Sequence, residues 1–262
     1  MRLRESIAIV VSLLLTLVAA IASAQTNTPH EAKPASRNQT NPAITAVTLD
    51  PFPGGVGSYW IYEGVVRQGS DEKPEEKKVR WRMSLERVIR RPGATAVIVK
   101  GFPGDPDWFG VDWSSTPPAK ESMFVTTDDG GIYQIYSEKG IPDAKFTDPC
   151  ITTQEFLRDE ELLFQWPPTV GAQPGGGNCP ERSDEMYCWV LFEAPGKGVL
   201  RGVKGIKPGS YTGYSLVYRT NPDDTEIGIT SGVGVTAYEY HHHGTVADIE
   251  LHLVGVHLAG KK

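Results

Sequence analysis

Several features that define familiar enzyme classes are missing from this chain of 262 residues. It has neither the GxSxG turn of a serine hydrolase nor the GxxxxGK[ST] loop that cradles phosphate groups. Strand-like and helix-like segments do not alternate, which disfavours a nucleotide-binding doubly wound sheet. Neither sign of charge dominates, because 26 Lys and Arg face 32 Asp and Glu, a net charge of -6. We therefore expect no nucleic-acid partner, since such a partner requires a basic surface.

Long hydrophobic runs are also missing, apart from one near the N-terminus. The apolar stretch from Ile7 to Ile21 follows two arginines and precedes Ala22-Ser23-Ala24, which is the order of a secretory signal peptide cleaved after Ala24. The stretch is shorter than the roughly 20 residues that span a bilayer. We therefore expect a secreted or periplasmic protein that has no transmembrane segment after cleavage.

The predicted domain organisation has three parts. Residues 1–24 form the signal peptide, and residues 25–45, rich in Asn, Thr and Pro without any apolar period, form a flexible leader. Residues 46–262 form a single β-dominated domain.

Cysteine is scarce, with only Cys150, Cys179 and Cys188. Export to an oxidising compartment favours a disulfide, and we favour Cys179 with Cys188 because this pair closes a short loop. The other two pairings stay open, since spacing alone does not fix connectivity. With no CxxC pair and no His between these cysteines, zinc bound by cysteines is disfavoured.

Glycine and proline are abundant, with 28 and 20 residues, which argues against long helical bundles. Short runs rich in Val, Ile, Tyr, Trp and Thr predict strands instead. These runs are Tyr59 to Val66, Lys78 to Ile89, Thr95 to Gly101, Glu121 to Thr126, Gly131 to Ser137, Met186 to Glu193, Ser210 to Arg219, Gly232 to His243 and Val246 to His257. Only Thr152 to Phe164 predicts a helix, with a capping box formed by Thr152 and Glu155.

The predicted fold is therefore all-β, a curved antiparallel sheet or partly closed barrel with one short helix. Residues 51–60 (PFPGGVGSYW) are echoed by residues 165–175 (QWPPTVGAQPG). The echo raises the alternative of two related halves that divide near residue 145.

The segment from Gly232 to Leu258 predicts a hairpin with one polar and one apolar face. If Gly244 and Thr245 form the turn, His241 lies opposite Asp248. The polar face then holds Glu239, His241, His243, Asp248, Glu250 and His252. The other face holds Tyr238, Tyr240, His242, Ala247, Ile249, Leu251 and Leu253, as expected for a hairpin over a core.

Two interpretations of the polar face compete. His241, His243 and Asp248 have the ligand types of a zinc or similar metal site, which would indicate a metal-dependent hydrolase. Alternatively, the face is simply solvated, with imidazoles beside carboxylates. We favour the solvated face because alternation already explains every residue, and we expect no cofactor.

The loop from Gly104 to Trp113 contains a second candidate site. Asp105 and Asp107 lie close in sequence to Trp108 and Trp113, a combination that glycan-binding sites use. Aromatic loops more often pack over the end of a sheet, because Trp is usually largely buried. Packing is therefore the favoured interpretation, and a glycan-binding module is the alternative.

The chain resembles a group of exported, β-rich bacterial proteins that have no assigned function. The resemblance rests on an N-terminal FP-x-x-x-G-x-x-W-x-Y element, a DGGIY hairpin, a WPPTVG element, a PGSY element and a C-terminal GVG-x-x-x-Y strand pair. In this chain they begin at Phe52, Asp129, Trp166, Pro208 and Gly232. The resemblance implies an antiparallel β architecture without established catalytic residues.

We therefore expect an exported, non-catalytic binding or envelope-associated protein. A concave sheet of this kind can hold an apolar or amphipathic ligand, such as a lipid, between its inner face and the helix. The alternatives are the metal-dependent hydrolase and the glycan-binding module.

Overall fold

The computed structural model describes residues 51–70, 72–110, 115–135, 140–165, 187, 189–191 and 196–260. They belong to the second of two compact units of the chain, Ala46–Lys262. The elements are β1 (Tyr59–Ser70), β2 (Lys73–Arg91), β3 (Ala94–Lys100), β4 (Glu121–Thr127), β5 (Gly131–Ile135), α1 (Asp143–Thr147), α2 (Thr153–Phe156), β6 (Glu161–Gln165), β7 (Trp189–Leu191), β8 (Gly196–Leu200), β9 (Gly209–Arg219), β10 (Asp223–Thr230), β11 (Gly234–His242) and β12 (Val246–His257). Neither described helix has the length or hydropathy needed to cross a membrane. The predicted signal peptide and leader lie outside the described residues.

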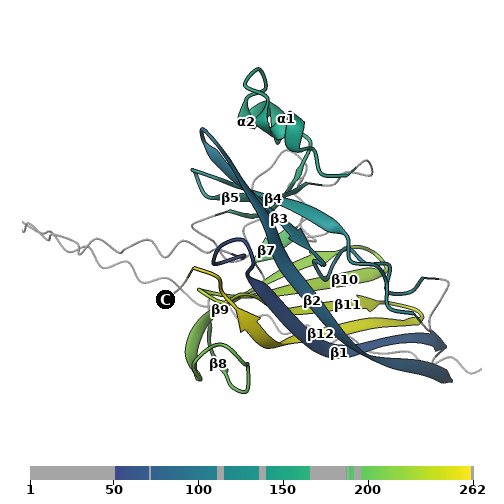
Figure 1. Cartoon of the computed structure of the whole chain (residues 1–262). Helices are drawn as coiled ribbons and strands as arrows, with labels where there is room; N and C mark the ends of the chain where they lie inside the picture. The colour runs from purple at the N-terminus through teal and green to yellow at the C-terminus, as the bar shows by residue number, and fades with distance from the viewer. Residues whose placement is uncertain are drawn as a thin grey trace, which may run out of the picture. The chain divides into compact units, whose positions relative to one another are not determined.

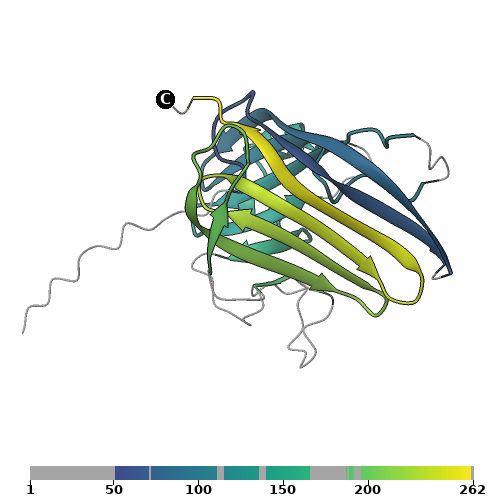
Figure 2. The same ribbon diagram turned by 90° about the horizontal axis from the view of Figure 1, so that it is seen from below.

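The strands form one antiparallel sheet that almost closes into a barrel (Figure 1). Their order is β6-β5-β4-β3-β2-β1-β12-β11-β10-β9-β7. β8 also pairs with β9, along a part of β9 that precedes the part paired with β7. In Figure 2 the green and yellow strands β9 to β12 lie in front of the teal strands β3 to β5. The all-β prediction is confirmed, although two short helices replace the single one expected.

The first and last strands meet in the middle of this sheet. β1 pairs with β12 over the register Tyr59↔His257 to Gly69↔Val246. Gly64 lies so close to β12 that a Cβ atom on it would stand 1.8 Å from the Glu250 carbonyl oxygen. The sheet therefore divides into two groups of strands, a meander of β1–β6 and a group β7–β12 in which β7 and β8 both pair with β9. The suggested relation between the two halves in sequence stays a prediction.

Two of the motifs behind the resemblance contact each other in the fold. The Trp60 indole donates to the Val233 carbonyl (2.6 Å), and the Tyr62 hydroxyl donates to the Val235 carbonyl (3.0 Å). Gly234 has a φ of +103°, which glycine adopts without strain. A Cβ atom at this position would overlap Trp60 and the N-terminal loop. Both aromatic residues are fully buried, so these motif positions stabilise the barrel interior.

The sheet buries apolar side chains on both of its faces. The inner core fills the barrel and includes Trp60, Tyr62, Met83, Phe124, Leu216, Ile227 and Leu251. A smaller outer core lies on the opposite face of β3 to β5 and comprises Ala94, Ala96, Met123, Val125, Ile135, Phe146, Phe156 and Leu157. The helices α1 and α2 supply Phe146 and Phe156 to this outer core. The expectation of a ligand between the inner face and a helix is therefore wrong, because the helices cover the outside of the barrel.

The predicted helix over Thr152–Phe164 is also wrong in extent. The capping box of Thr152 and Glu155 is present, but α2 ends at Phe156 and the apolar residues from Leu162 onward enter β6. Pairing with β5 offers those residues a partner that an isolated helix lacks, so tertiary contacts override the helical pattern.

The C-terminal hairpin has the predicted register. Ala237 lies opposite His252, Glu239 opposite Glu250 and His241 opposite Asp248. Leu251 is fully buried, whereas His241 is exposed. The predicted separation of the two faces is therefore confirmed.

Candidate functional site

The loop after β3 (Gly101–Gly110) folds into the barrel. Phe102 and Trp108 are buried in the inner core, and the Trp108 indole donates to the Pro103 carbonyl (2.9 Å). The ring of Trp108 packs against Trp81 with centroids 4.9 Å apart. Trp108 therefore presents no open face to a sugar, and its place in the core agrees with packing over the sheet. Trp113 lies outside the described residues.

The two aspartates of this loop have different surroundings. Asp107 is exposed. Asp105 points inward, where its carboxylate accepts hydrogen bonds from the Gln134 side-chain amide (3.2 Å) and from the Ser122 hydroxyl. Gln134 and Ser122 are both buried on the inner face of β5 and β4. The site therefore places a carboxylate inside the barrel, held by two neutral polar side chains.

Burial changes the protonation behaviour of Asp105. It raises the pKa of this carboxyl to about 6, although the hydrogen bond from Ser122 and the charge of Lys120 oppose the rise. The group thus keeps its charge at neutral pH in a site that disfavours charge. Strongly perturbed carboxyls in cavities are typical of functional sites.

A cavity of about 240 Å³, which we call the polar cavity, includes in its lining the hydrogen-bond partner of Asp105, Gln134. It is lined by Phe102, Gly104, Gln134, Trp189, Tyr218, Thr225, Ile227 and Tyr238. Burial, the charge of Asp105 and the neighbouring Tyr240 raise the pKa of the Tyr238 hydroxyl far above its usual range, so this hydroxyl stays protonated. The Trp189 indole nitrogen is buried and has no hydrogen-bond acceptor within the described part of the chain.

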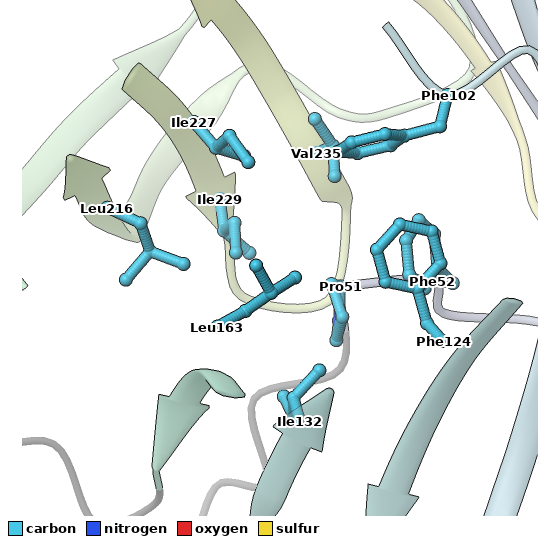
Figure 3. Close-up of a pocket in the computed structure, with 10 residues that line it drawn as sticks. All are labelled: Pro51, Phe52, Phe102, Phe124, Ile132, Leu163, Leu216, Ile227, Ile229 and Val235. Carbon is cyan, nitrogen blue, oxygen red and sulfur yellow. The ribbon is translucent and has the colours of Figure 1, made fainter. Parts of the chain in front are cut away.

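A second, apolar pocket adjoins the polar cavity through their shared residues Phe102 and Ile227. Figure 3 shows its side chains projecting toward one another from both halves of the sheet, among them Phe124, Ile132 and Ile229. Its volume of about 20 Å³ is room for little more than one water molecule. The interior therefore combines the larger polar cavity with a nearly filled apolar pocket.

A second carboxylate lies on the inner face near the polar cavity. Asp223 stands two residues before Thr225 in β10, and its carboxylate accepts from the Tyr240 hydroxyl (2.6 Å) and bonds to His242 (2.7 Å). Burial opposes the ionisation of Asp223, but hydrogen bonds with Tyr240, His242 and Thr220 outweigh it and lower the pKa of this carboxyl. Asp223 therefore adds a second negative charge.

The proposed metal ligands do not converge. The His241 ring nitrogen bonds to Asp248 (3.0 Å), whereas that of His243 bonds to Asp224 (3.2 Å). Both imidazoles are exposed on the outer face of the hairpin. Across the residues that the structure describes, no group of three or more His, Cys, Asp or Glu is arranged to hold a metal ion.

The structure describes only Cys150 of the three cysteines. Cys179 and Cys188 lie outside the described residues, so their pairing stays a prediction. Cys150 is exposed and forms no disulfide.

The cavity residues that sequence reasoning missed are polar or aromatic residues at inward positions of strands. Gln134 in β5 shares its face with the buried Ile132, and a polar residue at an inward position is a signal that alternation analysis can detect. Trp189, Tyr218 and Thr225 follow ordinary alternation, and nothing in their local sequence distinguishes them from core residues.

Comparison with known proteins gives no assignment. No family model and no curated protein matches the chain. A predicted exported protein of Bacteroides fragilis with a YmcC-like fold is similar over 80% of this chain and 99% of its own, with a TM-score of 0.40 and 8% identity. A predicted lipoprotein of Parabacteroides distasonis gives a TM-score of 0.36 and 11% identity over the same shares. Likenesses this remote establish neither a family nor a function.

Proposed function

We propose that this chain is an exported, non-catalytic binding protein that holds a small amphipathic ligand inside its barrel. The observation that carries the proposal is the polar cavity, where the Gln134 amide and the Tyr238 phenol belong to the lining and the half-buried Asp105 carboxylate lies behind Gln134. A few convergent polar groups in a mainly apolar lining are typical of small-molecule sites. The signal-peptide pattern of residues 1–24 supports export.

The volumes favour a small ligand over a long-chain lipid. The polar cavity, at about 240 Å³, lies just below the roughly 300–1,000 Å³ of common small-molecule sites. The apolar pocket has no room for an acyl chain unless its side chains move. A compact molecule with one polar end and a short apolar part fits this interior best.

Mass spectrometry of the purified protein tests the proposal. Protein exported to the periplasm and purified without detergent should release a small molecule on denaturation with organic solvent. Thr225→Phe places a bulky side chain in the polar cavity and should abolish this release, whereas His252→Phe on the exposed outer face of β12 should not. Equal recovery from both variants, or no compound from the unmodified protein, would contradict a binding function.

A further inference from the structure

The walls of the polar cavity are mainly aromatic. Trp189 and Tyr218 stand side by side on β7 and β9, with ring centroids 5.4 Å apart. Tyr238 comes from β11, and Phe102 comes from the loop after β3. Gly104 lets that loop pack closely, because a Cβ there would stand 3.3 Å from the Tyr238 ring. Four aromatic side chains from four segments therefore surround one space.

The charge of this space is negative. Asp105 lies behind Gln134, which itself lines the cavity, and Asp223 lies beyond Thr225. None of the described lining residues is Lys, Arg or His. The charge of Lys120 acts on Asp105, but Lys120 is exposed and lies outside the lining. An anionic ligand would therefore meet no basic side chain among the described lining residues.

We propose that the polar cavity binds a small organic cation, a primary or quaternary amine, which is held by the aromatic walls and by the charge of Asp105. This inference rests on the proposed binding function and names its ligand class. Aromatic faces attract cations through their negative quadrupole, and the attraction is strongest where the ion is removed from water. A carboxylate behind the aromatic wall provides the balancing charge that burial of a cation requires.

The Trp189 indole contributes its ring to the wall, whereas its N–H is buried away from the open space of the cavity. The small apolar pocket beyond Phe102 and Ile227 limits the rest of the molecule to short substituents. A small ammonium compound of the size of choline meets these conditions.

Choline and its neutral isostere 3,3-dimethylbutan-1-ol test the role of charge directly. The two have nearly the same shape and the same hydroxyl, but carbon replaces the charged nitrogen in the alcohol. Calorimetric titration of the full-length mature protein should give an affinity for choline about tenfold higher than for the alcohol, as expected for a desolvated cation–π site. This comparison needs no variant, so it does not depend on the folding of a mutant.

Two variants of the same loop test whether Asp105 supplies the charge that holds the cation. Asp105→Asn should remove most of the preference for choline and leave the affinity for the alcohol unchanged. Asp107→Asn, in the same loop but exposed, should keep the preference. Equal affinities for choline and the alcohol in the unmodified protein, or a preference for butyrate over both, would overturn the cation inference while leaving a binding function in place. Failure of all three molecules to bind would also overturn the cation inference, whereas the binding function is decided separately by the release of a small molecule on denaturation.

Discussion

Asp105 should cost the folded protein stability at neutral pH, and its replacement by asparagine should recover that stability. Burial raises the pKa of this carboxyl from an ordinary value of 3.8 to about 6. At 1.36 kcal/mol per pH unit the rise corresponds to about 3 kcal/mol. An asparagine side chain has a similar shape and accepts the same hydrogen bond from Gln134, but carries no charge to desolvate.

The direction of the pH dependence follows from the two states of the chain. The folded protein holds the Asp105 proton more tightly than the unfolded chain, so the folded state binds more protons between about pH 4 and pH 6. The stability contributed by this group therefore falls as pH rises through that window and levels off above it. At low pH, where Asp105 is protonated in both states, the acid and the amide should be nearly equivalent.

Urea unfolding followed by tryptophan fluorescence measures the effect. At about pH 8, Asp105→Asn should raise the free energy of unfolding by about 2–3 kcal/mol, and at about pH 4 the difference should be close to zero. The control Asp107→Asn should stay within about 0.5 kcal/mol of the unmodified protein at both pH values, because the residue is exposed. If Asp105→Asn changes stability by the same amount at both pH values, the carboxyl is not desolvated as the structure indicates.

Two further predictions address the barrel closure and the outer histidines. Gly64→Ala should destabilise the protein by about 1–3 kcal/mol in the same urea assay, because its methyl group would overlap the Glu250 carbonyl of β12. The control Gly198→Ala in β8, where a Cβ meets nothing within 4 Å, should change stability by less than about 0.5 kcal/mol. If the two variants lose the same free energy of unfolding, β1 and β12 do not approach this closely. Added zinc should leave the melting temperature of tag-free protein unchanged, because His241 and His243 bond to different carboxylates. Stoichiometric binding of zinc that raises the melting temperature of the protein would instead support the metal-dependent hydrolase.

The stability cost at Asp105 is consistent with a role of this residue in binding. A charged side chain that lowers the stability of the folded protein fits a functional role, because binding sites commonly trade stability for activity. The favoured role of Trp108 in packing, by contrast, explains its burial without any ligand. The same loop thus supplies one residue to the core and another to the proposed site.

Local pattern was enough to predict much of the sheet. The strand candidates from Tyr59 onward agree with β1, β2, β3, β4, β5, β9, β11 and β12 within a few residues at most ends. β2 is longer than predicted, since the charged residues before Lys78 pair with β1 and extend the strand. Cross-strand ion pairs such as Arg67 with Glu76 make this exposed extension favourable, and charge content alone does not reveal them.

The candidate site was predictable only in part. Asp105 stood out because it lies among aromatic residues in a loop, and Tyr238 was placed on the inner face by alternation. Their partners were not predicted. Gln134 lies in β5, next to one end of the strand order, and Trp189 lies in β7 at the other end. Only the curvature of the sheet brings them to one cavity.

The sequence by itself determined the local properties of this protein. The period of two in the C-terminal hairpin set its register, because a shift by one residue would bury His241 and expose Leu251. The tertiary structure alone decided which inward side chains share a space and which face the helices cover. Those outcomes depend on how far the sheet curls and on which strands meet across the barrel, and no interaction between neighbours in sequence encodes either one.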